Sequence, residues 1–329
     1  MSNSRLFLYT LCGVIFCISF IGMIIYGYKT FFIETKKVES ENYTYHFALI
    51  AEEADNAYWR LIEKGAEKAA SKHDIYLEYL APTRADNDKL LKLLDRMISA
   101  KVDGIIVQGV EGERFVDLVH KGVEREIPII TVDTDVPGSE RKAYVGTDNY
   151  RAGKLAGKAV IQHTTGEQYV GIVMGRFDAI NQKRRLEGFK QAIKDVPRIH
   201  IAAMNESNIT SIGAAQAAYS LLKENPSITA FVGMSALDGI GIVEGVQEIA
   251  PEKNVTIISF DLMPETRKLI REGKIDATIA QYPRKMGTKA VNVLMELQKH
   301  DLLDNEMFTG TKVIEKEDLH SIKNDGESK

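Results

Sequence analysis

The sequence contains little cysteine. Cys12 and Cys17 are its only two, and both lie within the first 28 residues. The remainder therefore has neither a disulfide nor a cysteine-bound metal site. A large excess of one charge is also absent, because the chain has 42 basic and 46 acidic side chains and a net charge of −4. This balance disfavours a nucleic-acid partner, which requires a basic face.

Motifs for catalysis, metals and cofactors are missing as well. The chain has no H-E-x-x-H sequence, no paired-histidine metal spacing and no G-x-S-x-G nucleophile turn. Gly239, Gly241 and Gly245 follow a strand-like run, but their spacing is one residue longer than a dinucleotide-binding loop requires. We expect these glycines to allow close helix packing. The sequence therefore predicts no catalytic residue, no metal and no cofactor.

One apolar run stands at the N-terminus. The 23 residues from Leu6 to Tyr28 carry no charge, and a helix of that length spans a hydrocarbon core of about 30 Å. A cleaved signal peptide is the alternative, but its apolar region is shorter, about 7–15 residues, and a small-residue cleavage site follows it. A lipoprotein signal is disfavoured because bulky residues precede both cysteines. We predict a membrane anchor over residues 1–28 and a spacer over residues 29–43.

From residue 44 onward, short apolar runs alternate with helical patterns. In residues 56–73 and 87–100 the apolar positions recur at three- and four-residue steps, which indicates amphipathic helices. The strand-like runs are His46–Ala51, Ile75–Leu80, Gly104–Val107, Ile127–Val132, Tyr169–Met174, Ile201–Met204, Ala230–Met234, Thr256–Phe260 and Ala277–Ala280. Strands separated by helices predict an α/β fold with parallel sheets. Their number favours two similar halves, one ending near Gly146 and one beginning with Tyr169.

Polar and aromatic residues recur where these strands end, which is where α/β proteins bind ligands. They are Glu52, Asp55, Asn56, Tyr58 and Trp59 after the first strand, then Asp133 and Thr134, then Asp261, and then Gln281. A single acid at a strand end is usually a turn residue or a helix cap, but four such ends in both halves indicate a site. Carboxylates, amides and ring faces together suit a polyhydroxylated ligand.

At these residues the sequence resembles the type I periplasmic sugar-binding proteins, the ribose/galactose-binding class. The resemblance extends from about Tyr45 to Leu319 through the stretches FALIAEEADNAYW, VDGIIVQGV, IPIITVDTD, YVGTDNYRAGKLAG, RRLEGF, ISFD and ATIAQYPRKMG. It implies two Rossmann-like lobes joined by a three-strand hinge. The implied boundaries are residues 44–147 with 282–308 for the N-terminal lobe, 148–281 with 309–320 for the C-terminal lobe, and 321–329 for a tail.

The resemblance also implies roles for individual residues. Asn56 would bond the sugar, Tyr58 and Trp59 would sandwich its ring, Asp133 and Asp261 would accept hydroxyls, and Gln281 would bond near the hinge. Four positions depart from the usual pattern and complete the expected site: Glu52 replaces a small polar residue, Thr134 and Lys183 replace arginines, and Ser235 replaces asparagine. The site is therefore expected to lack two guanidinium donors, and an amino sugar or another cationic polyol is a conceivable ligand.

The apolar N-terminal run also bears on function. Repressors of the LacI type share this fold but carry a DNA-binding helix-turn-helix where this chain has its apolar span, so we reject that reading. We predict a single-pass membrane protein whose binding domain is extracytoplasmic and closes on a sugar or polyol, as a sensor for a partner such as a histidine kinase. Delivery of sugar to an ABC transporter permease is the alternative, and an enzyme acting on a small metabolite is the third hypothesis.

Overall fold

The computed structural model describes residues 9, 12–17, 19–24, 43–299 and 304–321. The chain divides into two units, residues 1–43 and 44–329. The predicted anchor lies partly, and the predicted spacer and tail almost wholly, outside the described residues. Within the described ranges, none of the helices is both long and apolar enough to cross a membrane.

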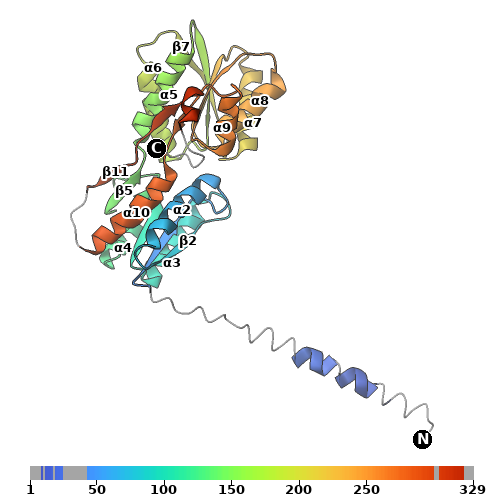
Figure 1. Cartoon of the computed structure of the whole chain (residues 1–329), viewed down its shortest axis with the longest axis vertical. Coiled ribbons are helices and arrows are strands. Elements are labelled where there is room, and N and C mark those ends of the chain that lie inside the picture. The colour runs from blue at the N-terminus through green and yellow to red at the C-terminus, as the bar shows by residue number, and fades with distance from the viewer. Residues whose placement is uncertain (1–8, 10–11, 18, 25–42, 300–303, 322–329) are drawn as a thin grey trace. The chain divides into compact units, whose positions relative to one another are not determined.

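The second unit contains two lobes, each built on a six-stranded sheet (Figure 1). The N-terminal lobe has the strand order β11-β5-β4-β3-β1-β2, and its neighbouring strands are parallel. Its strands are β1 (Tyr45–Ile50), β2 (Ile75–Leu80), β3 (Gly104–Gln108), β4 (Ile129–Val132), β5 (Ala143–Gly146) and β11 (Glu306–Phe308). Its helices are α2 (Ala57–Ala70), α3 (Asn87–Ala100), α4 (Glu113–Glu124) and α10 (Pro283–Gln298).

The C-terminal lobe repeats this plan with the order β12-β10-β9-β8-β6-β7, in which only the β10–β12 pair is antiparallel among the described strands. Its strands are β6 (Gln168–Met174), β7 (Ile199–Glu206), β8 (Ala230–Gly233), β9 (Thr256–Phe260), β10 (Ala277–Ala280) and β12 (Lys312–Ile314). Its helices are α5 (Asn149–His163), α6 (Ile180–Ile193), α7 (Ser211–Glu224), α8 (Asp238–Ile249), α9 (Pro264–Arg271) and the short 3-10 turn η1 (Glu317–His320).

Each sheet has helices on both faces, which explains why its strands are almost wholly apolar. In the N-terminal lobe α2 and α10 pack on one face, and α3 and α4 pack on the other. In the C-terminal lobe α5 and α6 cover one face, and α7, α8 and α9 cover the other. The parallel α/β architecture and the two lobes predicted from the alternating pattern are thus confirmed. The sequence prediction missed the short strands β5, β11 and β12.

The helices pack closely where glycines face a neighbouring backbone. A Cβ atom at Gly241 would lie 2.1 Å from the carbonyl oxygen of Ser211, and one at Gly245 would lie 2.3 Å from that of Ala215. A side chain at either position would therefore collide with the backbone of α7. The predicted packing role of these glycines is confirmed.

The chain passes between the lobes three times, in the segments 147–148, 281–282 and 309–311. Each crossing leads from the end of a strand in one lobe to an element of the other. All three lie at the edge of the sheets formed by β5 and β11 in one lobe and by β10 and β12 in the other. The ends of the central strands β1, β4 and β9 therefore face the space between the lobes.

Candidate ligand-binding cleft

A cavity lies between the lobes at the carboxyl ends of these strands. Its empty space, counted together with its opening to solvent, is about 410 Å³. The lining residues are Glu52, Asn56, Tyr58, Trp59, Asp133, Asn181, Gln182, Arg185, Ile209, Ser235, Ala236, Asp261 and Gln281. The tertiary structure thus brings eight of the ten predicted site residues to one place. Their roles in binding remain predictions.

Two aspartates occupy equivalent positions at the base of this cavity. Asp133 follows β4 with a φ of 64°, and Asp261 follows β9 with a φ of 65°. Aspartate is one of the few residues other than glycine that adopts this left-handed conformation readily. The turn removes each side chain from the regular alternation of its strand, and both side chains are almost completely buried.

Asp133 receives hydrogen bonds from both lobes. The Tyr58 hydroxyl donates to its Oδ1 atom at 2.7 Å, and the Thr134 hydroxyl lies 3.1 Å from its Oδ2 atom. Asn181, which belongs to α6 of the other lobe, donates its Nδ2 hydrogen to the same Oδ2 atom at 3.1 Å. Burial, and next the charge of Asp133, raise the pKa of Tyr58 well above its usual value, so the phenol remains a donor. Asp133 is thus held in a fixed orientation as an acceptor.

A buried arginine organises the opposite side of the cavity. Arg185 is 2% exposed and donates to the Asn149 side chain at 2.8 Å and to the Met234 carbonyl at 2.7 Å. Its guanidinium group lies 4.5 Å from the centre of the Phe260 ring. A Cβ atom at Gly153 would lie 1.9 Å from the Arg185 carbonyl oxygen. Close packing of α5 on α6 therefore fixes the backbone that carries this side chain.

Arg185 is linked to the second aspartate, Asp261, by the side-chain amide of Gln281. Its Nη2 atom donates to Gln281 Oε1 at 3.0 Å, and Gln281 Nε2 donates to the two carboxylate oxygens of Asp261 at 3.0 and 3.2 Å. Burial nevertheless raises the pKa of Asp261 to about 7, although the charge of Arg185 acts in the opposite direction. Asp261 therefore changes its protonation state near neutral pH.

Glu52, at the end of β1, adds a third carboxyl group. Burial, and next the charge of Asp133, raise the pKa of Glu52 to about 7, while Arg176 and hydrogen bonds with Gln108 and Trp59 act to lower it. The cavity therefore takes up protons as the pH falls through neutrality. Such groups accept ligand hydroxyls when they are charged and can donate a hydrogen when they are neutral.

Ser235 provides an unused polar group. Its hydroxyl oxygen is buried and lies beside the Asp238 carboxylate without forming a hydrogen bond of regular geometry to any described residue. The adjacent backbone is fixed by Asp238, whose carboxylate accepts from the Ser235 N–H at 2.7 Å and from the Ser207 hydroxyl at 2.6 Å. An unpaired buried hydroxyl is costly, so a ligand hydroxyl at this point would recover a hydrogen bond.

Two predicted residues lie outside this cavity. Thr134 lines a small adjoining pocket that also contacts Glu52. Lys183 is part of an ion pair, with its Nζ atom 2.6 Å from Glu111 Oε2, and both side chains are largely exposed. This pair joins α6 of the C-terminal lobe to the loop before α4. In this structure Lys183 therefore connects the lobes at their edge and does not line the cavity.

Thr134 and Lys183 supply no guanidinium group, but the cavity contains one that the sequence prediction missed, because Arg185 lines it. Positions two apart on a helix face different directions, so Arg185 points inward while Lys183 points outward. The stretch RRLEGF contained this signal, since it places an arginine on the apolar face of the helix together with Phe189. Asn181 and Gln182 were also missed, because amides at a helix start are usually caps.

The structure places no metal cluster at the site. Among the described residues, no group of three or more His, Cys, Asp or Glu side chains is arranged to hold a metal ion. The arrangement of acceptors, amides and rings instead suits a neutral polyol, whose hydroxyl groups both donate and accept.

Comparison with known proteins is consistent with this geometry. Residues 47–301 match the family described as periplasmic binding protein domain. The crystal structure of GanP, a glucose-galactose binding protein from Geobacillus stearothermophilus, is 45% identical and has a TM-score of 0.80, covering 84% of this chain and 98% of GanP. The XylFII-LytSN complex contains a chain that is 38% identical with a TM-score of 0.78, covering 83% of this chain and 98% of that one. The D-allose-binding periplasmic protein of Escherichia coli K12 is 23% identical over 262 residues, 77% of this chain and 84% of its own length.

Proposed function

Because the chain belongs to the periplasmic binding protein domain family, we propose that it is an extracytoplasmic protein that closes its two lobes around a sugar. Members of this family bind ligands and do not catalyse reactions, so the chain is not an enzyme. The observation that carries the proposal is the cavity in which Asp133 and Asp261 face each other across the two lobes with amide and aromatic neighbours.

The relatives support a sugar as the ligand. GanP is a glucose-galactose binding protein, and the E. coli relative binds D-allose. In this chain Asp133, Asp261 and the Ser235 hydroxyl offer acceptors to ligand hydroxyls, while Asn181 offers a donor. Trp59 and Tyr58 meet edge to face, with ring centres 6.2 Å apart, and supply apolar surface for the ring of a sugar.

Closure follows from the same contacts. Asn181 already joins the lobes through Asp133, and the Lys183–Glu111 pair joins them at the edge. A ligand that contacts both lobes favours the closed state by its difference in affinity for the two states. We infer that sugar binding shifts the hinge equilibrium toward closure.

A thermal-shift screen tests the proposal. A ligand that binds only the folded state stabilises it by about 2.7 kcal/mol at a concentration one hundred times its Kd. We expect D-glucose, D-galactose or D-allose to raise the melting temperature of the purified chain, with ribose, arabinose, inositol and glucosamine completing the screen. L-Glucose is the matched control, because it has the same composition but the wrong stereochemistry. If none of these compounds changes the melting temperature, the proposal fails.

We further propose that the chain is anchored by residues 1–28 and reports sugar to a membrane sensor kinase. The uncharged run from Leu6 to Tyr28 supports the anchor, and the XylFII-LytSN complex supports a signalling partner. Transport is the second candidate, since a relative 23% identical is the ribose import binding protein RbsB of E. coli. Cross-linking of the tagged chain in its native membranes distinguishes them: recovery of a kinase supports sensing, and recovery of a permease supports transport.

Carbonate extraction tests the anchor separately. A chain held by a transmembrane helix remains in the membrane pellet at high pH, whereas a peripheral or secreted chain is released. Recovery of the chain in the soluble fraction would contradict the anchor without affecting the sugar proposal.

A further inference from the structure

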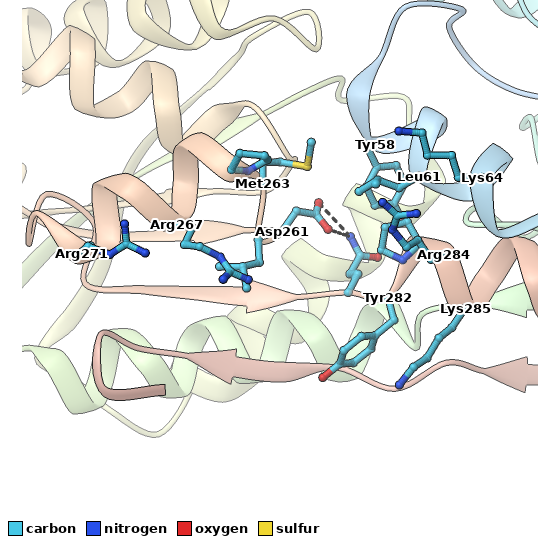
Figure 2. Close-up of a pocket in the computed structure, with 14 residues that line it drawn as sticks. Tyr58, Leu61, Lys64, Asp261, Met263, Arg267, Arg271, Tyr282, Arg284 and Lys285 are labelled. Carbon is cyan, nitrogen blue, oxygen red and sulfur yellow. Dashed lines mark hydrogen bonds between the residues drawn. The ribbon is translucent and has the colours of Figure 1, made fainter. Parts of the chain in front are cut away.

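A second, larger pocket lies beside the cleft, and five of the fourteen residues that line it are cations (Figure 2). Its basic residues are Lys64, Arg267, Arg271, Arg284 and Lys285, and Asp261 is its single acidic residue. In Figure 2 Arg267 and Arg271 lie on one side of Asp261, and Lys64, Arg284 and Lys285 lie on the other. The first two belong to α9 of the C-terminal lobe, and the other three belong to α2 and α10 of the N-terminal lobe. The pocket therefore spans both lobes.

The positive lining continues along the N-terminal lobe. A neighbouring pocket between α2 and α10 contains Lys68, Lys72, Lys285 and Lys289 and has no acidic residue in its lining. Lys64 and Lys68 are four residues apart and lie on one side of α2, and Lys72 follows in the turn after the helix ends. Lys285 lines both pockets, which makes them one continuous surface. We call these eight cations and the surface between them the basic groove.

The cations of the basic groove are gathered in one place, and Asp261 is the single acidic residue in the lining of its two pockets. Some basic side chains on other surfaces pair with acids, for example Lys121 with Asp95 at 2.6 Å and Arg114 with Asp88 at 3.0 Å. In the described part of the chain, no carboxylate oxygen lies within 4.0 Å of the charged nitrogens of seven of the groove cations, Lys64, Lys68, Lys72, Arg271, Arg284, Lys285 and Lys289. This segregation occurs in a chain with more acidic than basic residues overall.

Two further features describe what the groove can hold. The Arg284 Nε atom is buried without a hydrogen-bond partner among the described residues, so one donor awaits an acceptor. Apolar surface lies between the cations, contributed by Leu61, Met263 and Tyr282, and by Phe308, which is 46% exposed. An isolated small anion needs only a compact cluster of donors, whereas an extended groove with alternating basic and apolar surface matches an amphipathic acidic chain.

We propose that the basic groove is a docking surface for an acidic segment of a partner protein, with carboxylates on the lysines and arginines and apolar side chains between them. Because the cations of α9 and those of α2 and α10 belong to different lobes, docking at their junction depends on the angle between the lobes. The partner would thereby bind the closed state and the open state with different affinities. This last step rests on the proposed function, whereas the docking itself does not.

Fluorescence anisotropy with a labelled peptide of glutamate and leucine residues tests the docking. The triple variant Lys64→Glu, Lys68→Glu, Lys285→Glu reverses exposed charges in the groove. The matched control Lys92→Glu, Lys158→Glu, Lys190→Glu makes the same change in net charge at exposed lysines of α3, α5 and α6. We expect the full chain in detergent to bind the peptide, the groove variant to bind it at least about tenfold more weakly, and the control to retain binding. Higher salt should weaken the binding of the unmodified chain.

Several results would overturn the proposal. These are the absence of peptide binding at low salt, an equal loss in both triple variants, or displacement of the peptide by millimolar inorganic phosphate, which would indicate a small-anion site. In nanodiscs, protection of Lys64 from acylation by anionic but not by neutral lipid would assign the groove to the membrane surface instead.

The sugar dependence is measured separately, by repeating the peptide titration with saturating D-glucose or D-galactose. If the partner binds preferentially to the closed state, saturating sugar changes the peptide affinity. Saturating peptide then changes the sugar affinity by the same factor. An unchanged affinity in both directions overturns the preference for the closed state. If no sugar binds at all, the proposed function fails while the peptide result, obtained without sugar, still decides the docking.

Discussion

The two lobes present the same backbone feature with different surroundings. Asp133 and Asp261 each follow a central strand with positive φ, and each accepts a hydroxyl hydrogen bond at its carbonyl oxygen, from Tyr144 at 2.8 Å and from Thr278 at 2.7 Å. Their carboxylates differ. Asp133 accepts from three side chains, including one of the other lobe, whereas Asp261 accepts from Gln281 alone among the described residues.

This difference shows that the repeated fold determines the position of each carboxylate but not the groups that donate hydrogen bonds to it. Around Asp133 the solvation comes from direct donors. Asp261 has no direct contact of this kind with Arg185, because the amide of Gln281 lies between the two side chains. Burial raises the pKa of Asp261 to about 7. We infer that the N-terminal lobe offers an oriented acceptor, and that the C-terminal lobe offers one whose protonation depends on pH.

The largest effect on stability is expected when Arg185, which supports Asp261 through Gln281, is replaced. Arg185→Met removes donors to Asn149, Met234 and Gln281 in a buried site, which should lower the free energy of unfolding by about 3 kcal/mol. Urea denaturation measures the change. Arg184→Met, at an exposed position of the same helix, is the control and should cost less than about 0.5 kcal/mol. Equal effects of the two substitutions would contradict the organising role of Arg185.

Removal of either acid tests whether the two lobes contribute equally to binding. Asp133→Ala and Asp261→Ala should each weaken binding by roughly 2–3 kcal/mol, because ligand hydroxyls lose a charged acceptor. The ligand for this test is the sugar that gives the largest thermal shift. Isothermal titration calorimetry measures this. Asp117→Ala on the exposed side of α4 controls for the loss of one carboxylate. Unchanged affinity in one variant would remove that acid, and with it that lobe's acceptor, from the site.

The raised pKa of Asp261 predicts a pH dependence of stability. The folded state binds this proton more tightly than the unfolded state, so the stabilisation is fully present below the ordinary pKa of 3.8 and is lost as the pH rises to about 7. The free energy of unfolding should therefore fall over that window, and less steeply in Asp261→Asn. Denaturant titrations across this range measure it. An identical slope in the variant would show that Asp261 does not hold the proton.

Glu52 should add to the same slope, because burial raises its pKa to about 7 as well. Glu52→Gln is expected to reduce the slope further when combined with Asp261→Asn. The same titrations measure the double variant. If the double variant has the slope of Asp261→Asn alone, Glu52 does not contribute.

The smallest effect is expected at the edge of the cleft. The exposed ion pair of Lys183 with Glu111 joins the lobes, but such pairs contribute only about 0–1 kcal/mol. Lys183→Met should therefore change sugar affinity by less than about fivefold, with less effect at high salt. A loss as large as that of Asp133→Ala would return Lys183 to the ligand site, through a conformation different from the one described.

Much of the fold follows from local sequence. Most of the strands and both of the helices described by residue periodicity were predicted within a few residues, because buried strands and amphipathic helices leave regular apolar patterns. Strands β11 and β12 have only three residues each, which is too short for a pattern, whereas β5 was missed although it has four residues, like the predicted strands β4, β8 and β10. Their place in the sheets depends on pairing with distant segments.

The sequence alone determined the α/β architecture and the positions of Asp133, Asp261 and Gln281 at strand ends, because strand periodicity and the residue that ends it are local properties. The sequence places Arg185 on the apolar face of α6, but only the tertiary structure decided that Arg185 lines the cavity while Lys183 pairs with Glu111. The rotation of α6 against the sheet, set by packing on α5, determines that choice. It likewise brought α2, α9 and α10 together, so that cations far apart in sequence became one surface.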